Sequence, residues 1–175
     1  MKKFKLTNET KIHLGIILHR IKALRDIPKF NIKKGDLGGF VEKESNLSHE
    51  FDSWVSDNAQ VYGNAQVYDN ARVFGNAQVS GNAWVSGNAL IFDNAQVYGD
   101  SWLESSKDIM NIIIPSKFSI TITPQNITIG CQLKTRKEWL KVSKKEAIKM
   151  GLPANMYDHY RLLIKTGMKL IPERR

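Results

Sequence analysis

The amino-acid sequence predicts a mainly β protein whose central part is a parallel β-helix of hexapeptide repeats. Residues 58–99 repeat the phrase Asn-Ala-x-Val-x-Gly seven times, with a period of six residues. A period of six is typical of parallel β-helices, whereas helical repeats need about 33 to 47 residues. The alanine and the valine two residues later lie on the same face of a short strand, because side chains alternate along a strand. The repeat therefore predicts a narrow solenoid with these two side chains inside.

The predicted interior alternates small with branched side chains. Branched residues stack well along flat walls, and small residues let the backbone close in near the corners. The branched or large positions are Val55, Val61, Val67, Val73, Val79, Val85, Ile91, Val97 and Leu103, and the small positions are Ala59, Ala65, Ala71, Ala77, Ala83, Ala89, Ala95 and Ser101. These nine units predict three coils, and Ile109 opens a last, imperfect unit.

Each repeat also carries its own corner. Gly or Asp followed by Asn is the pair that tolerates left-handed backbone angles, so each unit is one wall plus one sharp turn. Asp57, Asp69 and Asp93 are therefore interpreted as turn formers rather than as a catalytic acid and base. Three such corners close a triangle, and the asparagines of successive coils are expected to hydrogen-bond across about 4.8 Å.

The outward side chains sort into three walls, because residues three units apart lie above one another. We name each wall by its side chains. The tryptophan wall carries Gln66, Tyr68, Trp84, Ser86, Trp102 and Glu104; the phenylalanine wall carries Trp54, Arg72, Phe74, Leu90 and Phe92; the glutamine wall carries Gln60, Tyr62, Gln78, Ser80, Gln96 and Tyr98. We expect the glutamine wall to face water.

The other two walls expose large apolar side chains, and contiguous patches of that kind usually mark contacts. Either the chain's own flanks or neighbouring subunits are expected to cover them. Tyr68, Arg72, Trp84 and Trp102 are the candidate ligand- or partner-binding residues. For the two tryptophans, burial in a subunit interface and stacking on a ligand both remain open.

Three segments are expected along the chain: an N-terminal flank over residues 1–40, the β-helix over 41–109, and β-strands with two helices over 110–175. Val41 and Leu47 begin a first coil that an excursion around His49 interrupts. Residues 12–24 fit a strand or a helix, because their periodicity decides neither.

The C-terminal segment begins with three β-rich runs separated by Pro115 and Pro124. A helix is then predicted over 135–151, since Thr135 and Glu138 form a capping-box pattern and Gly151 ends it. Its core-facing side chains are expected to be Trp139, Leu140, Ala147 and Ile148. A second helix is predicted over 154–168.

Charge is distributed unevenly along the chain. Residues 1–50 carry 11 basic and 6 acidic side chains, residues 51–106 carry one and six, and residues 107–175 carry 14 and five. The acidic repeat therefore does not suit a phosphate backbone, which needs several cations. An anionic partner is expected to meet the basic flanks instead.

The cysteine count and the lack of a long apolar stretch predict where the protein is located and whether it contacts a membrane. Cys131 is the one cysteine, so the chain has no intramolecular disulfide, as is typical of the cytoplasm. No stretch approaches the roughly 20 apolar residues of a membrane span. We therefore expect a cytoplasmic protein with no membrane partner.

The repeat resembles the left-handed parallel β-helix of the hexapeptide-repeat family, whose members include acyltransferases and nucleotide-sugar enzymes and are usually trimeric. The segments RIKALRDI, KKGDLGGFVEKESNLS and ITIGCQLKTRKEWL extend the likeness to small hexapeptide-repeat proteins of phages and prophages. The resemblance implies a left-handed β-helix, a homotrimer and, if the protein is phage-encoded, the cytoplasm of a host cell. It implies no established reaction.

The sequence favours a binding protein over an enzyme. Acyltransferases that this repeat resembles use a histidine as general base, and His49 is the one weak candidate. One cysteine and four separated histidines lack metal-ligand spacing, and no cofactor is expected. We therefore expect a non-enzymatic homotrimer that holds an anionic small molecule, such as a signalling nucleotide, or a host protein in intersubunit clefts, in a counter-defence or host-modulating role. The alternatives are an acyltransferase with His49 as base and a structural assembly protein.

Overall fold

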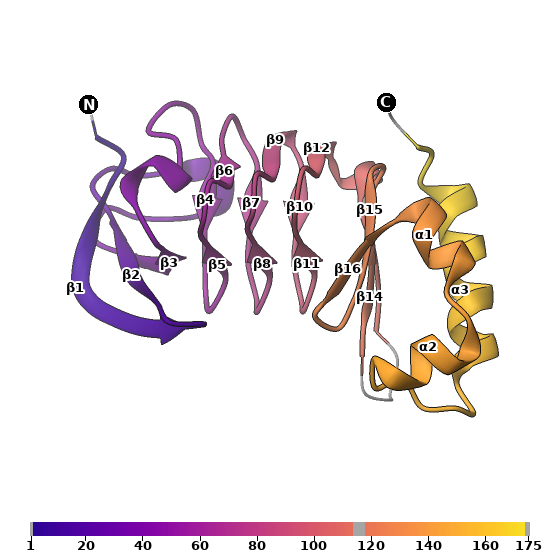
Figure 1. The fold of residues 1–175 in the computed structure, drawn as a ribbon. Coiled ribbons are helices and arrows are strands. Elements are labelled where there is room, and N and C mark those ends of the chain that lie inside the picture. Colours follow the sequence, from indigo (N-terminus) through magenta and orange to yellow (C-terminus); the bar gives the residue numbers. More distant parts are fainter. Residues whose placement is uncertain (1, 114–117, 174–175) are drawn as a thin grey trace.

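The computed structural model describes residues 2–113 and 118–173; Pro115 lies outside them. The chain forms a β-solenoid of about four turns, with a β-hairpin at one end and a sheet with three helices at the other (Figure 1). The prediction of a mainly β protein with a parallel β-helix is thus confirmed. Among the described residues, no helix is both long enough and apolar enough to span a membrane.

The N-terminal flank is β-structure that continues into the solenoid. Strands β1 (Phe4–His13) and β2 (Ile16–Ala23) form an antiparallel hairpin. Residues 12–24, which fit a strand or a helix, therefore contain the end of β1, the turn at Leu14 and Gly15, and β2. A short 3₁₀ turn, η1 (Pro28–Phe30), leads to β3 (Leu37–Val41). Because β3 pairs antiparallel with β2 and parallel with β5, flank and solenoid share one sheet and one apolar core.

Each solenoid strand pairs in parallel with strands one turn away. The strands are β4 (Trp54–Val55), β5 (Gln60–Val61), β6 (Gln66–Val67), β7 (Arg72–Val73), β8 (Gln78–Val79), β9 (Trp84–Asn88), β10 (Leu90–Ile91), β11 (Gln96–Val97) and β12 (Trp102–Ser105). The glutamine wall follows the order β3-β5-β8-β11, the phenylalanine wall β4-β7-β10 and the tryptophan wall β6-β9-β12. Val61 lies beside Val79 and Val79 beside Val97, which is the expected register.

The interior and the corners are as predicted. Every predicted inward side chain from Val55 to Leu103 is at most 1% exposed. Asp57, Asp69 and Asp93 have φ between 54° and 57°, so they are turn formers. Asn64 donates to Asn82 at 3.3 Å, and Asn82 donates to Asp100 at 3.0 Å, which forms the expected ladder between coils.

The first coil contains the expected excursion. A short 3₁₀ turn, η2 (Glu44–Asn46), precedes Leu47, which bridges in parallel to Val67 of the next coil. The chain then bulges outward, and Phe51 takes a left-handed conformation with φ of 49° and 61% of its surface exposed. The excursion therefore projects an aromatic ring from the solenoid.

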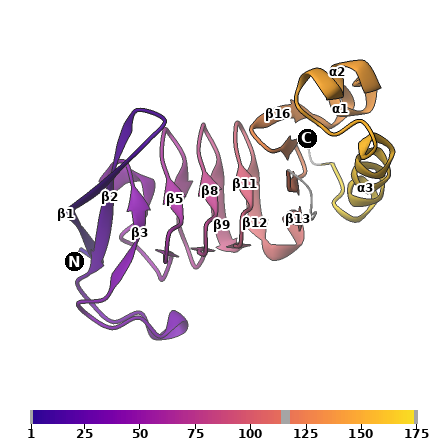
Figure 2. The ribbon, with the colours of Figure 1, turned by 90° about the horizontal axis from the view of Figure 1, so that it is seen from below.

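An antiparallel sheet closes the other end of the solenoid (Figure 2). After η3 (Ser106–Asp108) its strands are β13 (Met110–Ile112), β14 (Ile120–Ile122), β15 (Asn126–Ile129) and β16 (Gln132–Thr135). Thr121 and Gln125 accept the backbone N–H groups of Gln96 and Trp102, at 3.0 and 3.2 Å, so this sheet satisfies donors of the last coil.

The predicted helix over 135–151 is two helices, α1 (Arg136–Lys141) and α2 (Lys144–Lys149). Ser143 starts α2 with its own capping box, which ends the first helix two residues earlier. Leu140 and Ile148 were expected in the core, and this was wrong: they are 37% and 44% exposed. Trp139 and Ala147 are buried as predicted, against the sheet and α3 (Tyr157–Leu170).

Candidate binding site on the aromatic walls

The glutamine wall is covered at both ends, contrary to the expectation that it faces water. Gln60 and Tyr62 are buried beneath the β1–β2 hairpin, where the His13 ring meets the Tyr62 ring edge-on at 5.3 Å. At the other end Tyr98 donates to Gln78 at 2.7 Å, and burial raises the pKa of Tyr98 above its ordinary value. Figure 2 shows β5, β8 and β11 between the hairpin and β16. The flanks of the chain therefore cover the ends of this wall, while Gln78 and Gln96 stay partly exposed.

The tryptophan wall is open. Trp84 and Trp102 are 43% and 51% exposed, and their rings meet edge-to-face with centroids 6.1 Å apart. Tyr68 continues the row, with its ring 5.8 Å from that of Trp84. Because β6, β9 and β12 are adjacent in one sheet, the three rings form a continuous aromatic strip.

The charged groups beside this strip are acidic. A shallow recess next to the two tryptophans is lined by Asn82, Asp100 and Ser101. Glu104, two residues after Trp102 on the same strand, is also exposed. The strip thus offers flat apolar surface to a ligand, and among the described residues the side chains of the strip and its recess include no cation.

The phenylalanine wall is covered at its first strand, β4, and open at its last strand, β10. Trp54 is fully buried beneath the N-terminal flank, whereas Leu90 and Phe92 are 36% and 41% exposed. The rings of Phe74 and Phe92 stack with centroids 5.5 Å apart and planes 19° from parallel. A second aromatic strip therefore runs along this wall.

Arg72 supplies a cation to the phenylalanine wall. Its guanidinium lies 4.8 Å from the centroid of the Phe74 ring and 5.3 Å from that of Phe30, which η1 contributes. Its Nε atom is buried and has no hydrogen-bond partner among the described residues. Lys29, next to Phe30, reaches Asn88 at 2.9 Å and adds a second cation on this side.

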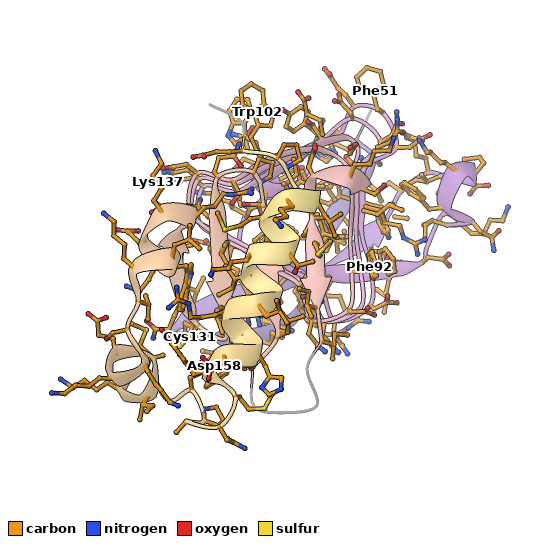
Figure 3. The ribbon with its side chains drawn as sticks, turned by 90° about the vertical axis from the view of Figure 1, so that its right-hand side faces the viewer. Phe51, Phe92, Trp102, Cys131, Lys137 and Asp158 are labelled. Carbon is orange, nitrogen blue, oxygen red and sulfur yellow. The ribbon has the colours of Figure 1, made fainter. Side chains whose placement is uncertain are left out.

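The two aromatic walls flank one edge of the prism, and Phe51 projects from that edge. The backbone N–H groups of Asp52 and Ser53 bond to the Asp69 carbonyl, which fixes the excursion at the corner between the walls. Figure 3 looks along the solenoid and shows Phe51 between Trp102 on one side and Phe92 on the other. The sequence predicted Tyr68, Arg72, Trp84 and Trp102 here. It missed Phe30 and Phe51, and for Phe51 the two-residue excursion was the available signal.

His49 is fixed within the first coil. Its Nδ1 accepts the backbone N–H of Lys3 at 3.1 Å, and its Nε2 lies 2.8 Å from Glu44 Oε1. Its ring also stacks on Phe4, with centroids 4.4 Å apart. Since Nδ1 accepts a hydrogen bond, Nε2 carries the proton and donates to Glu44. Both ring nitrogens are therefore engaged within the protein.

Lys3, which the sequence did not single out, is a fully buried lysine beside this histidine. Its Nζ donates to Ser53 Oγ at 2.9 Å and to the Glu50 carbonyl at 3.4 Å. Burial lowers the pKa of Lys3 to about 7, and the positive charge of Arg25 adds to this effect. Among the described residues, no group of three or more His, Cys, Asp or Glu side chains is arranged to hold a metal ion.

The repeat is similar to a known family. A family model described as YdcK Beta solenoid repeat matches residues 65–81 and 77–91. Both matches fall within the central coils, so the likeness concerns the repeat and not the flanks. No curated protein matches the chain.

Proposed function

We propose that this chain is a non-enzymatic homotrimeric binding protein that holds an anionic small molecule in clefts between subunits. One observation carries the proposal: two open aromatic walls flank one edge, while the chain's own flanks cover the ends of the third wall. A cyclic assembly joins one patch to a different patch of its neighbour. Two unlike apolar patches on either side of one edge suit such an assembly.

The shape of the prism supports a three-fold arrangement. A triangular prism presents an edge of about 60°, so three edges meeting at one axis leave three clefts of about the same angle. Phe51 projects from this edge and would lie near the axis. Each cleft would then be bounded by the tryptophan wall of one subunit and the phenylalanine wall of the next.

Such a cleft combines what neither wall has alone. Trp84 and Trp102 offer flat surface on which a ring system stacks, but their neighbours Asp100 and Glu104 repel an anion. Arg72, on the opposite wall, supplies a positive charge held in place by aromatic rings. This pairing suits a molecule with an aromatic ring and an anionic group, of which a nucleotide is one.

Two other functions are less well supported. An acyltransferase needs a base with a free lone pair, and both nitrogens of His49 are already engaged. A filament would stack the solenoids end to end. Each end is closed by a flank, and residues 1–50 and 107–175 carry net charges of +5 and +9, which repel one another.

The biological role that we propose follows the resemblance to phage and prophage proteins. A rigid trimer without catalytic machinery could act by sequestering a host signalling nucleotide, which is a counter-defence or host-modulating role. A host protein bound in the same clefts is the alternative occupant.

Native mass spectrometry of protein purified without denaturant tests the proposal, together with titration by nucleotides while tryptophan fluorescence is recorded. We expect a trimer that retains or takes up nucleotide and whose fluorescence changes on binding. Arg72→Gln should weaken binding at least ten-fold, because it removes the positive charge that meets the anion, and such a charged contact contributes about 1.5 to 3 kcal/mol. Arg20→Gln is the matched control, because Arg20 lies over the Phe40 ring on the covered wall.

Two results would count against the proposal. A trimer that neither carries nor takes up any nucleotide would exclude that ligand class. Equal loss of binding in Arg72→Gln and Arg20→Gln would show that the cleft is not the site.

A further inference from the structure

We call residues 118–173, which form most of the closing sheet and all three helices, the C-terminal cap. Its two short helices, α1 and α2, are copies of one eight-residue pattern. Residues 135–142 read TRKEWLKV and residues 143–150 read SKKEAIKM. Corresponding residues have the same role in the structure: Thr135 and Ser143 are N-caps, and Trp139 and Ala147 are buried. The cap therefore presents the same surface motif twice, an exposed aliphatic side chain with lysines on the same helix face.

The exposed lysines of this motif form no ion pair among the described residues. Lys137, Lys141, Lys145 and Lys149 are all exposed. The five ion pairs found among the described residues lie within residues 2–52 and involve none of these lysines.

The carboxylates that could neutralise them are used elsewhere. Glu138 and Glu146 each accept two hydrogen bonds, at 2.8 Å, from the N-cap residue of their own helix. The pKa of each is lowered, for Glu138 chiefly by the Thr135 hydroxyl and for Glu146 chiefly by the Ser143 backbone N–H. The two acidic side chains of the pattern therefore stabilise helix ends. They also attract Lys141 and Lys149, but two carboxylates do not neutralise four lysines, and the excess positive charge can bind an anion.

The net charge of the whole C-terminal cap is also positive, as an anion-binding surface requires. Residues 118–173 contain ten basic and four acidic side chains, a net charge of +6. Lys134, Lys144, Lys165 and Lys169 add to the charge around the two helices. The acidic solenoid, in contrast, has a net charge of −5 over residues 51–106. Positive charge thus lies at both ends of an elongated molecule (Figure 1), and the C-terminal end carries more of it.

We propose that the lysine surface of α1 and α2 binds the phosphate backbone of duplex nucleic acid without reading its sequence. Lysines are point charges that contact phosphates, and each contact releases a condensed counterion. Base recognition relies on arginine forks, amide side chains or stacked aromatic rings. In the described part of the cap, Arg136, Trp139, Tyr157 and Tyr160 are buried, so the exposed helices lack these groups.

A membrane surface fits the cap less well. Interfacial helices bury a wide apolar face about 5 to 10 Å into the bilayer. Here Leu140 and Ile148 are less than half exposed, and the helices have six residues each. Too little apolar surface is available for insertion, whereas charge is plentiful.

The test is fluorescence anisotropy of a labelled duplex of about 30 base pairs, with two unrelated sequences, over a series of salt concentrations. We expect similar affinity for both sequences and a linear fall of log K with log salt. Replacing Lys137, Lys141, Lys145 and Lys149 together by glutamine should weaken binding at least ten-fold. The slope of log K against log salt should also become shallower, by about one for each lysine that contacts a phosphate.

The control removes the same charge from the other flank, with Lys5, Lys22, Lys33 and Lys34 replaced by glutamine. It should retain nearly the full affinity. The substituted cap lysines are exposed and the capping residues are kept, so unchanged circular dichroism would confirm that the cap is folded. Parallel sedimentation with phosphatidylserine vesicles distinguishes a membrane from a nucleic acid.

Three outcomes would overturn the proposal. The wild-type protein could fail to bind the duplex at low salt, the control variant could lose as much affinity as the cap variant, or vesicles could be bound in preference to the duplex. The test uses residues outside the aromatic walls, so its failure would leave the proposed function untouched.

Discussion

At the scale of single residues, the solenoid depends on positions where the backbone of one coil almost touches the next. Gly81 has φ of +71°, and a Cβ atom placed there would lie 2.7 Å from the backbone nitrogen of Gly99. No side chain can move aside to relieve a contact between two backbones. Such glycines therefore set the spacing between coils.

Gly81→Ala should consequently lower the free energy of unfolding by about 2 to 5 kcal/mol. This adds the cost of a left-handed alanine, about 1 to 2 kcal/mol, to that of an overpacked contact. Gly15→Ala is the matched control, because Gly15 has φ of +80° with nothing within 4 Å of its added Cβ. Urea unfolding of both variants measures the difference. Equal losses would mean that the coils can separate without cost.

The buried amine of Lys3 should make the free energy of unfolding depend on pH. Its pKa is about 7 in the folded protein and 10.5 when the side chain is exposed to water. Between these values the unfolded chain binds more protons than the folded one, so the free energy of unfolding rises with pH. Below pH 7 the amine is charged in both states, and the full cost of its burial is present. Arg25, Asp52, Glu50 and His49 surround it.

Lys3→Met should abolish the part of this rise that Lys3 causes. Urea unfolding at about pH 6 and about pH 10 measures it, as the difference between wild type and variant. Lys5→Met replaces an exposed lysine two residues away, on β1, and should keep the wild-type pH dependence. The same slope in wild type and Lys3→Met would contradict a buried amine with a lowered pKa.

At the scale of elements, the sequence predicted what each repeat specifies locally. Strand, inward side chain and corner all lie within six residues, so Val79 and Asp93 could be assigned from the phrase itself. The flanks contain no such repeat, so their positions in the fold could not be assigned in the same way. That the β1–β2 hairpin folds over Gln60 and Tyr62 depends on contacts between residues far apart in the chain, which periodicity does not record.

The division of the predicted helix over 135–151 into two helices was likewise not predicted from the sequence. The capping box at Thr135 correctly predicts where α1 begins, whereas the equivalent box at Ser143, which divides the predicted helix in two, is not part of the prediction. Leu140 and Ile148 were assigned to the core because a longer helix would have turned them inward. Two short helices orient them outward instead, and this places them among the lysines. At the candidate binding site, Tyr68, Arg72, Trp84 and Trp102 follow from strand alternation, whereas Phe30 reaches Arg72 from a distant turn.

At the scale of the whole molecule, charge and apolar surface are segregated. Positive charge lies at the two ends, and the open aromatic strips lie along two sides of the acidic middle. Association side by side therefore covers apolar surface, whereas association end to end brings like charges together. This asymmetry underlies the homotrimer that we propose.

The proposed edge contact can be broken without disturbing the core. Phe51→Glu and Phe92→Glu place charges on side chains that are 61% and 41% exposed in the single chain. If Phe51 lies beside a three-fold axis and Phe92 lies where neighbouring walls meet, either variant should sediment as a monomer where the wild type sediments as a trimer. Three like charges near one axis, without compensating partners, are costly to bury.

Leu162→Glu provides the matched control, because Leu162 is 64% exposed but lies on α3, away from the walls. It should sediment like the wild type in a velocity experiment. Circular dichroism should be unchanged in all three variants, since none of the substituted side chains lies in the solenoid core. Wild-type protein that sediments as a monomer at every concentration would exclude the trimer, and a trimer that tolerates both glutamates would place its contacts on another face.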